Sequence, residues 1–207
     1  MRVDFYFDFL SPFSYLANHR LGKIAQKHTL EVVYHAIDLS KAKTAIGNVG
    51  PSNRDLKVKL DYLKVDLQRW ADIYGISLKF PPNFNSARLN TGVYYPEAAG
   101  IRSAYVQFVF DRVWGRGIAP DDEGLLDEVA RHFGWSERAF RDFVSGGDGL
   151  GAYDAATTAA IKRKVFGVPT MFFGEAMWWG NDRLFLLEQA LKDSEEQAHR
   201  AKPDPTR

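Results

Sequence analysis

Two short segments carry residue types that could support chemistry on a small molecule. The first is Ser11-Pro12 in FYFDFLSPFSYLA, where a serine stands directly before a proline that opens a helical pattern. A helix start presents unpaired backbone N–H groups and a partial positive charge, so it favours an anion. Taken alone, a serine at this place is more often an ordinary N-cap, and both interpretations stay open.

The second segment is KVFGVPT, which places Val168-Pro169 directly before an apolar strand. A trans proline that opens an edge strand is the simpler interpretation. A cis peptide bond would indicate a specific structural or functional role, because cis bonds are uncommon even before proline.

The chain has no cysteine, and this absence limits the chemistry further. It excludes disulfides, thiolate metal sites and a protein thiol nucleophile, so any thiol chemistry needs a thiol from a bound small molecule. A formal net charge of +1 at pH 7 favours neither nucleic acid nor anionic lipid as a partner. The 5 histidines lack paired metal-ligand spacing, and we expect no metal.

Periodicity predicts the elements that position the two segments. The alternation over residues 3–8 predicts a strand that stops at Ser11-Pro12, and a helix follows to about residue 26. The apolar run at residues 30–37 predicts a second strand. Together they form a strand–helix–strand unit, which is usually right-handed with parallel strands.

Residues 38–164 show mainly helical periodicity and predict an all-helical insertion. Its expected helices cover residues 53–75, 101–115, 123–133, 136–145 and 152–165. The glycine-rich run 146–151 lacks the Lys-Ser/Thr of a phosphate loop, so we interpret it as a connector.

The rest of the chain returns to strands. Short strands are predicted at 170–173 and 176–178, followed by a helix over 181–192 and a frayed polar tail over 194–207. With 45% apolar residues the chain has ample material for a core. No targeting segment and no apolar run long enough to span a bilayer stand out, so we expect a soluble cytoplasmic protein.

This order of elements, with a serine at a helix start and Val-Pro-Thr at a strand start, resembles the thioredoxin superfamily in its form with a helical insertion. Periplasmic disulfide oxidoreductases and kappa-class glutathione transferases share that form. The redox Cys-x-x-Cys of the superfamily corresponds here to Ser11-Pro12-Phe13-Ser14.

A narrower resemblance rests on four segments in order: DFYFDFLSPFSYLA, AIGNVGPSNRDLKVKLDYLKVDLQRWA, KVFGVPTMFFG and MWWGNDRL. Together they look like the 2-hydroxychromene-2-carboxylate isomerases of aromatic-hydrocarbon catabolism, over roughly residues 1–192. The resemblance implies an α/β thioredoxin-like fold. Residues 1–37 and 165–193 would form the glutathione-binding domain, residues 38–164 the helical insertion domain, and residues 194–207 a flexible tail.

The resemblance also implies a cofactor site for glutathione. Ser11 would support the glutathione thiolate, and Val168 would supply backbone hydrogen bonds beside Pro169, in the cis geometry that this superfamily uses. The remaining implied cofactor residues are Trp179, Gly180, Asn181 and Asp182. Asp182 could take the ammonium of the γ-glutamyl group, although an N-terminal carboxylate is otherwise an ordinary helix cap.

A substrate side is implied around Lys43, Asn53 and Arg54. These residues offer a cation, an amide and a fork-shaped donor to a carboxylate and a keto oxygen, although a basic stretch is more often a solvated face. Phe84 stands where the best-known members have a tyrosine, so a phenolic hydrogen bond to substrate is missing here.

The implied activity is a glutathione-dependent cis–trans isomerisation of an aromatic keto acid in naphthalene or polycyclic aromatic hydrocarbon catabolism, by a homodimer. Two alternatives remain. A kappa-like transferase or peroxidase would consume glutathione, and a catalytically silent thioredoxin-fold binding module would show no glutathione-dependent turnover. The missing cysteines exclude a thiol–disulfide oxidoreductase.

Overall fold

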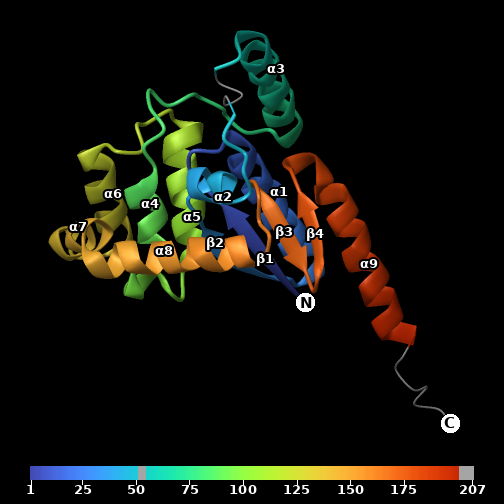
Figure 1. Cartoon of the computed structure of the whole chain (residues 1–207). Helices are drawn as coiled ribbons and strands as arrows, with labels where there is room; N and C mark the ends of the chain where they lie inside the picture. Colours follow the sequence, from blue (N-terminus) through green and yellow to red (C-terminus); the bar gives the residue numbers. More distant parts are fainter. Residues whose placement is uncertain (51–54, 201–207) are drawn as a thin grey trace.

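The computed structural model describes residues 1–50 and 55–200, and its centre is one mixed sheet with the strand order β2-β1-β3-β4 (Figure 1). The strands are β1 (Arg2–Phe7), β2 (Glu31–Ala36), β3 (Thr170–Phe173) and β4 (Ala176–Trp179). β1 runs parallel to β2 and antiparallel to β3, and β3 runs antiparallel to β4. The predicted strand–helix–strand unit and the C-terminal hairpin are confirmed.

Helices surround the sheet and fill the insertion. They are α1 (Pro12–His28), α2 (Leu39–Ala45), α3 (Lys57–Tyr74), α4 (Ala87–Gly92), α5 (Arg102–Phe110), α6 (Glu123–Phe133), α7 (Glu137–Ser145), α8 (Gly147–Lys162) and α9 (Leu184–Arg200). Short helical turns are η1 (Pro96–Ala98), η2 (Asp111–Gly115) and η3 (Asn181–Arg183). Helices α4 to α7 gather beside the sheet, and α8 leads back towards it (Figure 1).

Alternation along β1 divides its side chains between two cores. Val3, Phe5 and Phe7 are fully buried in the larger core, together with residues of α1, α5 and α9. The Phe7 ring lies 5.6 Å from the Phe110 ring of α5, so this core is continuous from the sheet into the insertion. Burying one phenylalanine side chain contributes about 1.5–3 kcal/mol, which makes this face of β1 a main source of stability.

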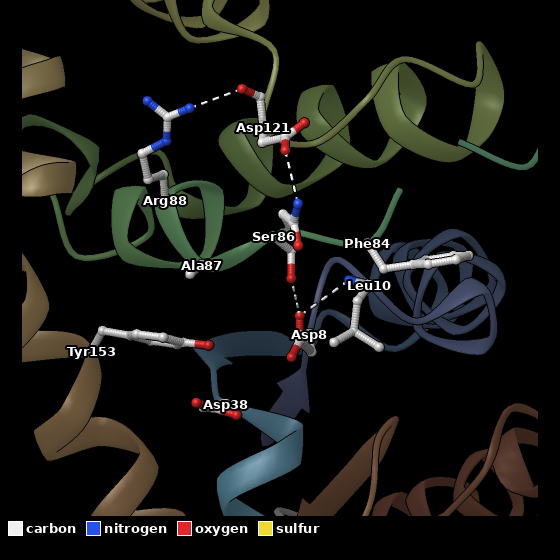
Figure 2. Close-up of a pocket in the computed structure, with 10 residues that line it drawn as sticks. Asp8, Leu10, Asp38, Phe84, Ser86, Ala87, Arg88, Asp121 and Tyr153 are labelled. Carbon is white, nitrogen blue, oxygen red and sulfur yellow. Dashed lines mark hydrogen bonds between the residues drawn. The ribbon is translucent and has the colours of Figure 1, made fainter. Parts of the chain in front are cut away.

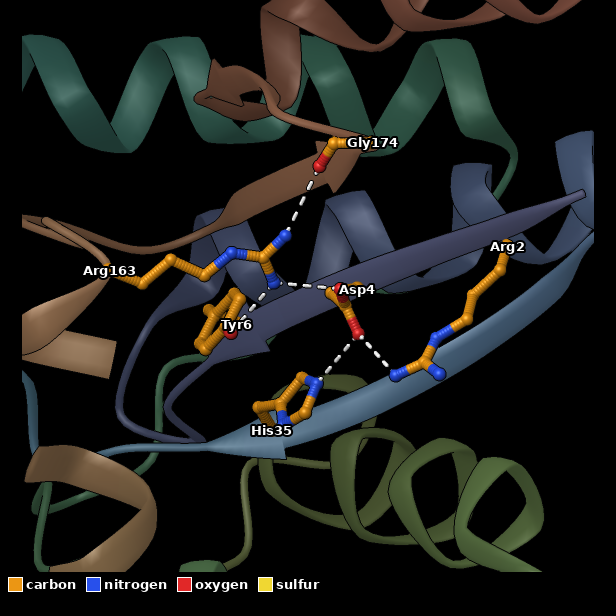
Figure 3. Close-up of polar contacts among 6 residues, drawn as sticks. All are labelled: Arg2, Asp4, Tyr6, His35, Arg163 and Gly174. Atoms are coloured by element: carbon orange, nitrogen blue, oxygen red, sulfur yellow. Dashed lines mark hydrogen bonds and ion pairs between the residues drawn. The ribbon is translucent and has the colours of Figure 1, made fainter. Parts of the chain in front are cut away.

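The opposite face of β1 carries Asp4 and Tyr6. Tyr6 packs in a second core with Ile37, Phe172 and Ala160 of α8. Asp4 accepts hydrogen bonds from Arg163 (2.7 Å), His35 (3.0 Å) and Arg2 (3.1 Å), as Figure 3 shows. We call Arg2, Asp4, His35 and Arg163 the Asp4 cluster.

Two elements were not predicted from the sequence. α2 and α4 are short, with 7 and 6 residues, so each offers less than two turns of periodicity. α2 nevertheless begins at a recognisable cap, because the Asp38 side chain accepts a hydrogen bond from the Lys41 N–H at 2.9 Å.

The interpretation of residues 146–151 as a connector is wrong, because α8 begins at Gly147 and runs through this segment. The glycines permit a close approach instead of a turn. A Cβ on Gly149 would lie 2.1 Å from the Phe143 carbonyl oxygen and 2.9 Å from Thr91 Cγ2. The start of α8 therefore packs directly against α7 and α4.

The predicted tail is also wrong for residues 194–200, because α9 continues to Arg200. The added turns of α9 contact α1 and also form an ion pair within α9. Glu195 lies 3.0 Å from the ring nitrogen Nδ1 of His28, and Glu196 pairs with Arg200 at 3.7 Å. The polar composition of residues 194–200 favoured a tail, but these residues form an exposed part of α9 that contacts α1 through His28. Residues 201–207 lie outside the described part of the chain.

Candidate active site

Ser11 lies where β1 passes into α1, and it caps the helix. Its Oγ accepts a hydrogen bond from the Ser14 N–H at 3.2 Å, and its own N–H donates to the Asp8 carbonyl at 3.0 Å. Pro12 occupies the first turn, which contains no acidic side chain. Because the Oγ acts as acceptor towards Ser14, its O–H proton stays available for an anion at the helix start.

The Val168–Pro169 peptide bond is cis, as predicted. β3 begins at Thr170, which pairs with Tyr6 on β1, so Pro169 lies near the same edge of the sheet as Ser11. Thr170 Oγ1 donates a hydrogen bond to the Gly167 carbonyl at 2.7 Å and fixes the turn before the strand.

The Trp179–Asp182 segment lies next to this turn. Thr170 pairs with Trp179 across the hairpin, and the Gly180 N–H donates to the Pro169 carbonyl at 2.9 Å. Trp179 also crosses Gly167, where an added Cβ would lie 2.6 Å from the indole Nε1. The structure therefore brings the predicted residues from both ends of the hairpin together.

Asn181 and Asp182 begin η3, which contacts α1. Asn181 is buried, and its Oδ1 accepts a hydrogen bond from the Tyr74 hydroxyl at 3.1 Å. Its Nδ2 is buried without a hydrogen-bond partner in the described chain, as is Ser14 Oγ in the first turn of α1. Asp182 is half-exposed and pairs with its neighbour Arg183.

These features fit a thiol tripeptide such as glutathione. A buried amide without a partner costs free energy that a ligand's acceptor would offset. The start of α1 favours a negative sulfur, and the half-exposed Asp182 carboxylate can exchange Arg183 for an ammonium group.

Of the predicted substrate residues, the structure describes Lys43 and Phe84. Lys43 lies in the last turn of α2, partly buried, and its ammonium has no ion-pair partner within residues 1–50 and 55–200. α2 follows the carboxyl end of β2, the parallel neighbour of β1, so Lys43 and Ser11 lie beyond the same edge of the sheet. Asn53 and Arg54 lie outside the described residues.

Phe84 lies in the segment that leads into α4, and its ring is 6.0 Å from the ring of Trp114. It lines a pocket of about 310 Å³ together with Leu10, Asp8, Ser86 and Tyr153 (Figure 2). The phenyl and leucine side chains form an apolar wall, and the carboxyl and hydroxyl groups form a polar one. An aromatic ring with one polar substituent is chemically suited to such walls.

Asp8 is a buried carboxyl group beside the pocket that the sequence analysis did not single out. Burial raises the pKa of its carboxyl group, and hydrogen bonds from Asn90 and Ser86 oppose that rise. Its signal was an acidic residue between Phe7 and Phe9, three positions before the helix cap, where an apolar side chain would otherwise be expected.

Within residues 1–50 and 55–200, no group of three or more His, Asp or Glu side chains could hold a metal ion. No helix in residues 1–50 or 55–200 is long and apolar enough to cross a membrane.

The fold and the site together define a thioredoxin-type protein. Residues 2–192 match the DsbA-like thioredoxin domain. Among curated proteins, the chain is 64% identical over 189 residues to a 2-hydroxychromene-2-carboxylate isomerase of Pseudomonas sp. (strain C18), covering 91% of this chain and 89% of that protein. A protein of the same name from Pseudomonas putida is 64% identical over 191 residues, 92% of this chain and 94% of that protein.

A solved structure gives the same result. The selenomethionine form of a 2-hydroxychromene-2-carboxylate isomerase superposes with a TM-score of 0.94 at 60% identity, covering 98% of this chain and 100% of that one. The chain thus belongs to the DsbA-like thioredoxin domains and, within them, to the 2-hydroxychromene-2-carboxylate isomerase family.

Proposed function

We propose that this protein is a glutathione-dependent isomerase that interconverts 2-hydroxychromene-2-carboxylate and trans-o-hydroxybenzylidenepyruvate. The observation that carries the proposal is Ser11, a capping serine at the start of α1 in a chain without cysteine. The 64% identity to proteins named for this isomerisation supports it. The reaction involves no net redox change, so it needs no pair of protein thiols.

The cofactor and the protein divide the chemistry. Bound glutathione would supply a thiolate that adds reversibly to the β-carbon of the open enone, so that the former double bond can rotate. The protein's part is to hold the tripeptide with the Val168 backbone, the segment Trp179–Asp182 and the unpaired amide of Asn181. The Ser11 hydroxyl would donate a hydrogen bond to the sulfur.

The energies of these contacts are sufficient for thiolate formation. A thiol with a pKa of about 8.5–9 is only a few per cent ionised at pH 7, and lowering its pKa by about two requires about 2.7 kcal/mol. A hydrogen bond to a charged group contributes about 1.5–3 kcal/mol, and a helix terminus about 0.3–1 kcal/mol. Ser11 and the start of α1 can therefore supply the whole shift.

The substrate's own charges need donors on the facing side. The substrate carboxylate, and a keto oxygen that would carry negative charge while the former double bond is single, are stabilised by fixed cations and amides. We assign these roles to Lys43, Asn53 and Arg54. Phe84 offers an apolar face in place of a phenol, so the aromatic ring of the substrate would pack against Phe84 and Leu10.

The wider setting follows from this assignment. We propose that the protein acts in the cytoplasm, as a homodimer, in the breakdown of naphthalene or related polycyclic aromatic hydrocarbons. The chromene carboxylate and its open isomer are products of aromatic ring cleavage, and a pyruvate side chain prepares the product for carbon–carbon cleavage.

The test is the dependence of turnover on a free thiol. Absorbance of a chromene-carboxylate mixture is followed with dialysed protein alone, with glutathione, and with S-methylglutathione, which keeps the tripeptide but blocks the sulfur. We expect turnover with glutathione alone and no net loss of thiol. Comparable turnover without added thiol would overturn the proposal, and stoichiometric loss of glutathione would favour the transferase or peroxidase alternative.

A further inference from the structure

Asp8 follows the last residue of β1, and its buried carboxylate accepts four hydrogen bonds. Oδ1 accepts from the Leu10 N–H (3.1 Å), the Ser86 hydroxyl (2.7 Å) and the Asn90 amide (2.7 Å). Oδ2 accepts from the Leu39 N–H at 3.2 Å. The residue is 2% exposed, so these donors replace water almost completely.

The four donors belong to three segments that all border the proposed site. Leu10 lies in the turn that ends at Ser11, and the Ser11 N–H donates to the Asp8 carbonyl, so Asp8 holds that turn twice. Leu39 is the first residue of α2, and Lys43 follows one turn later. Ser86 is the N-cap of α4 and follows Phe84 by two positions (Figure 2), and Asn90 lies within that helix.

Neighbouring bonds complete this arrangement. Asn90 donates to Asp8 and accepts from the Phe9 N–H at 3.1 Å through its Oδ1, so one amide grips two successive residues. Trp114, in η2, donates from its Nε1 to the Phe9 carbonyl at 2.7 Å. The backbone from Asp8 to Ser11 is thereby held at each peptide unit.

We propose that Asp8 is a positioning residue, whose carboxylate fixes the Ser11 turn relative to the segments that carry Lys43 and Phe84. The proposal rests on the proposed function, since it concerns how the residues that would hold the glutathione thiol are positioned relative to those that would hold the substrate. An addition step is sensitive to that positioning, because a misplacement of about 1 Å can cost about a hundredfold in rate.

The chemistry of the four donors explains why a carboxylate serves here. All four are neutral, and three of them converge on one oxygen, which a carboxylate can accept but a neutral amide oxygen accepts less strongly. Replacing Asp8 by asparagine would also turn an N–H₂ group towards one of these donors. The isosteric change therefore loosens the three segments without creating a cavity.

The first test compares Asp8→Asn with Asp4→Asn, which changes a partly buried carboxylate in β1, outside the site. We expect Asp8→Asn to lower kcat/KM for the chromene carboxylate by about tenfold to a hundredfold, while the glutathione Kd from calorimetry changes less than about threefold. Asp4→Asn should keep wild-type kinetics. If Asp8→Asn keeps kcat/KM within twofold, or if Asp4→Asn loses as much, the proposal is overturned.

A milder pair keeps the proposal testable should Asp8→Asn fail to fold. Ser86→Ala removes one donor to Asp8, and Thr91→Val removes a hydroxyl on the same helix that bonds only the Ala87 carbonyl (2.9 Å). Amide hydrogen exchange is measured at Leu10, Ser11 and Leu39 in both variants. We expect about tenfold faster exchange at these amides in Ser86→Ala and none in Thr91→Val.

The exchange measurement does not depend on turnover, so it separates the two proposals. Absence of thiol-dependent turnover in the wild type would count against the proposed function alone. Unchanged exchange at all three amides in Ser86→Ala, or equal acceleration in Thr91→Val, would show that Asp8 does not link the segments and would overturn the positioning role.

Discussion

Asp4 is a partly buried residue of strand β1 and Asp8 is a buried residue directly after the end of that strand, and the two carboxyl groups are held in opposite ways. Asp4 accepts hydrogen bonds from Arg163, His35 and Arg2, which are cationic or can become so (Figure 3). Asp8 accepts only from neutral N–H and O–H groups (Figure 2). Burial raises the pKa of both groups, but the partners of Asp4 outweigh it and hold its pKa at about 2.

The difference teaches where each residue acts. A carboxyl group whose pKa is lowered by folding stabilises the folded protein at neutral pH, whereas one whose pKa is raised destabilises it there. Asp4 thus contributes to stability far from Ser11. Burial raises the pKa of Asp8, which costs stability at neutral pH, and the residue lies just past the carboxyl end of β1, three positions before Ser11. This is the pattern expected of a functional position.

The largest effect that would sharpen this contrast is on stability. Asp4→Asn should lower the free energy of unfolding by about 2 kcal/mol at pH 7, because it removes a partly buried anion and leaves Arg163 without its main partner. Denaturant titration measures the change, and turnover should stay within twofold. Asp61→Asn, which breaks the exposed pair with Lys57, is the control and should cost less than about 0.5 kcal/mol. A loss below 1 kcal/mol for Asp4→Asn would remove the contrast.

The second effect is the dependence of that stability on pH. Folding lowers the pKa of Asp4 from 3.8 to about 2, and because solvent screens this group the corresponding gain in stability is at most about 2 kcal/mol. Since the folded pKa is depressed, this contribution is present above pH 4 and is lost as the pH falls from about 4 to 2. Asp8 has the opposite sign, because its contribution to stability is present at low pH and is lost as the pH rises.

The measurement is the stability gap between wild type and Asp4→Asn, taken by urea titration from pH 7 down to pH 3. About half of this contribution should have disappeared by pH 3, because Asp4 is then still mainly ionised in the folded protein and mainly protonated in the unfolded one. A gap that stays constant over this range would mean that Asp4 has an ordinary pKa, and the comparison with Asp8 would lose its electrostatic basis.

Local signals in the sequence were enough for the elements that carry the site. The alternation in β1, the proline at the start of α1 and the turn at Gly174 each depend on neighbouring residues, so they could be interpreted from periodicity and turn chemistry. The cis bond at Pro169 followed from resemblance to a superfamily, since no local pattern determines it.

The remaining features depend on contacts between distant residues. The partners of Asp8 lie 31, 78 and 82 positions away, at Leu39, Ser86 and Asn90, and no periodic pattern relates them. The helical start of α8 depends on a close approach to Phe143 and Thr91, and the length of α9 on His28. In each case tertiary packing overrode a composition that favours loops.

The third effect separates the cap from the catalytic group at the site end of β1. Ser11→Ala removes the hydroxyl that would support the thiolate, and we expect about a tenfold to hundredfold loss of rate at pH 7, or about 1.4–2.8 kcal/mol. Part of this loss should be recovered at higher pH, because the glutathione thiol then ionises without help. The same change also removes a helix cap, which costs about 1 kcal/mol of stability.

Ser136→Ala supplies the matched control, because Ser136 caps α7 with the same kind of bond, from the Ala139 N–H at 3.3 Å, outside the proposed site. It should lose similar stability and keep its pH–rate profile. A pH–rate profile at saturating glutathione, with a titration of the bound thiol by its absorbance near 240 nm, distinguishes the two roles. If Ser11→Ala keeps the wild-type thiol pKa and rate, Ser11 is a cap like Ser136, and the thiolate is stabilised by the backbone N–H groups that Asp8 helps to hold in place.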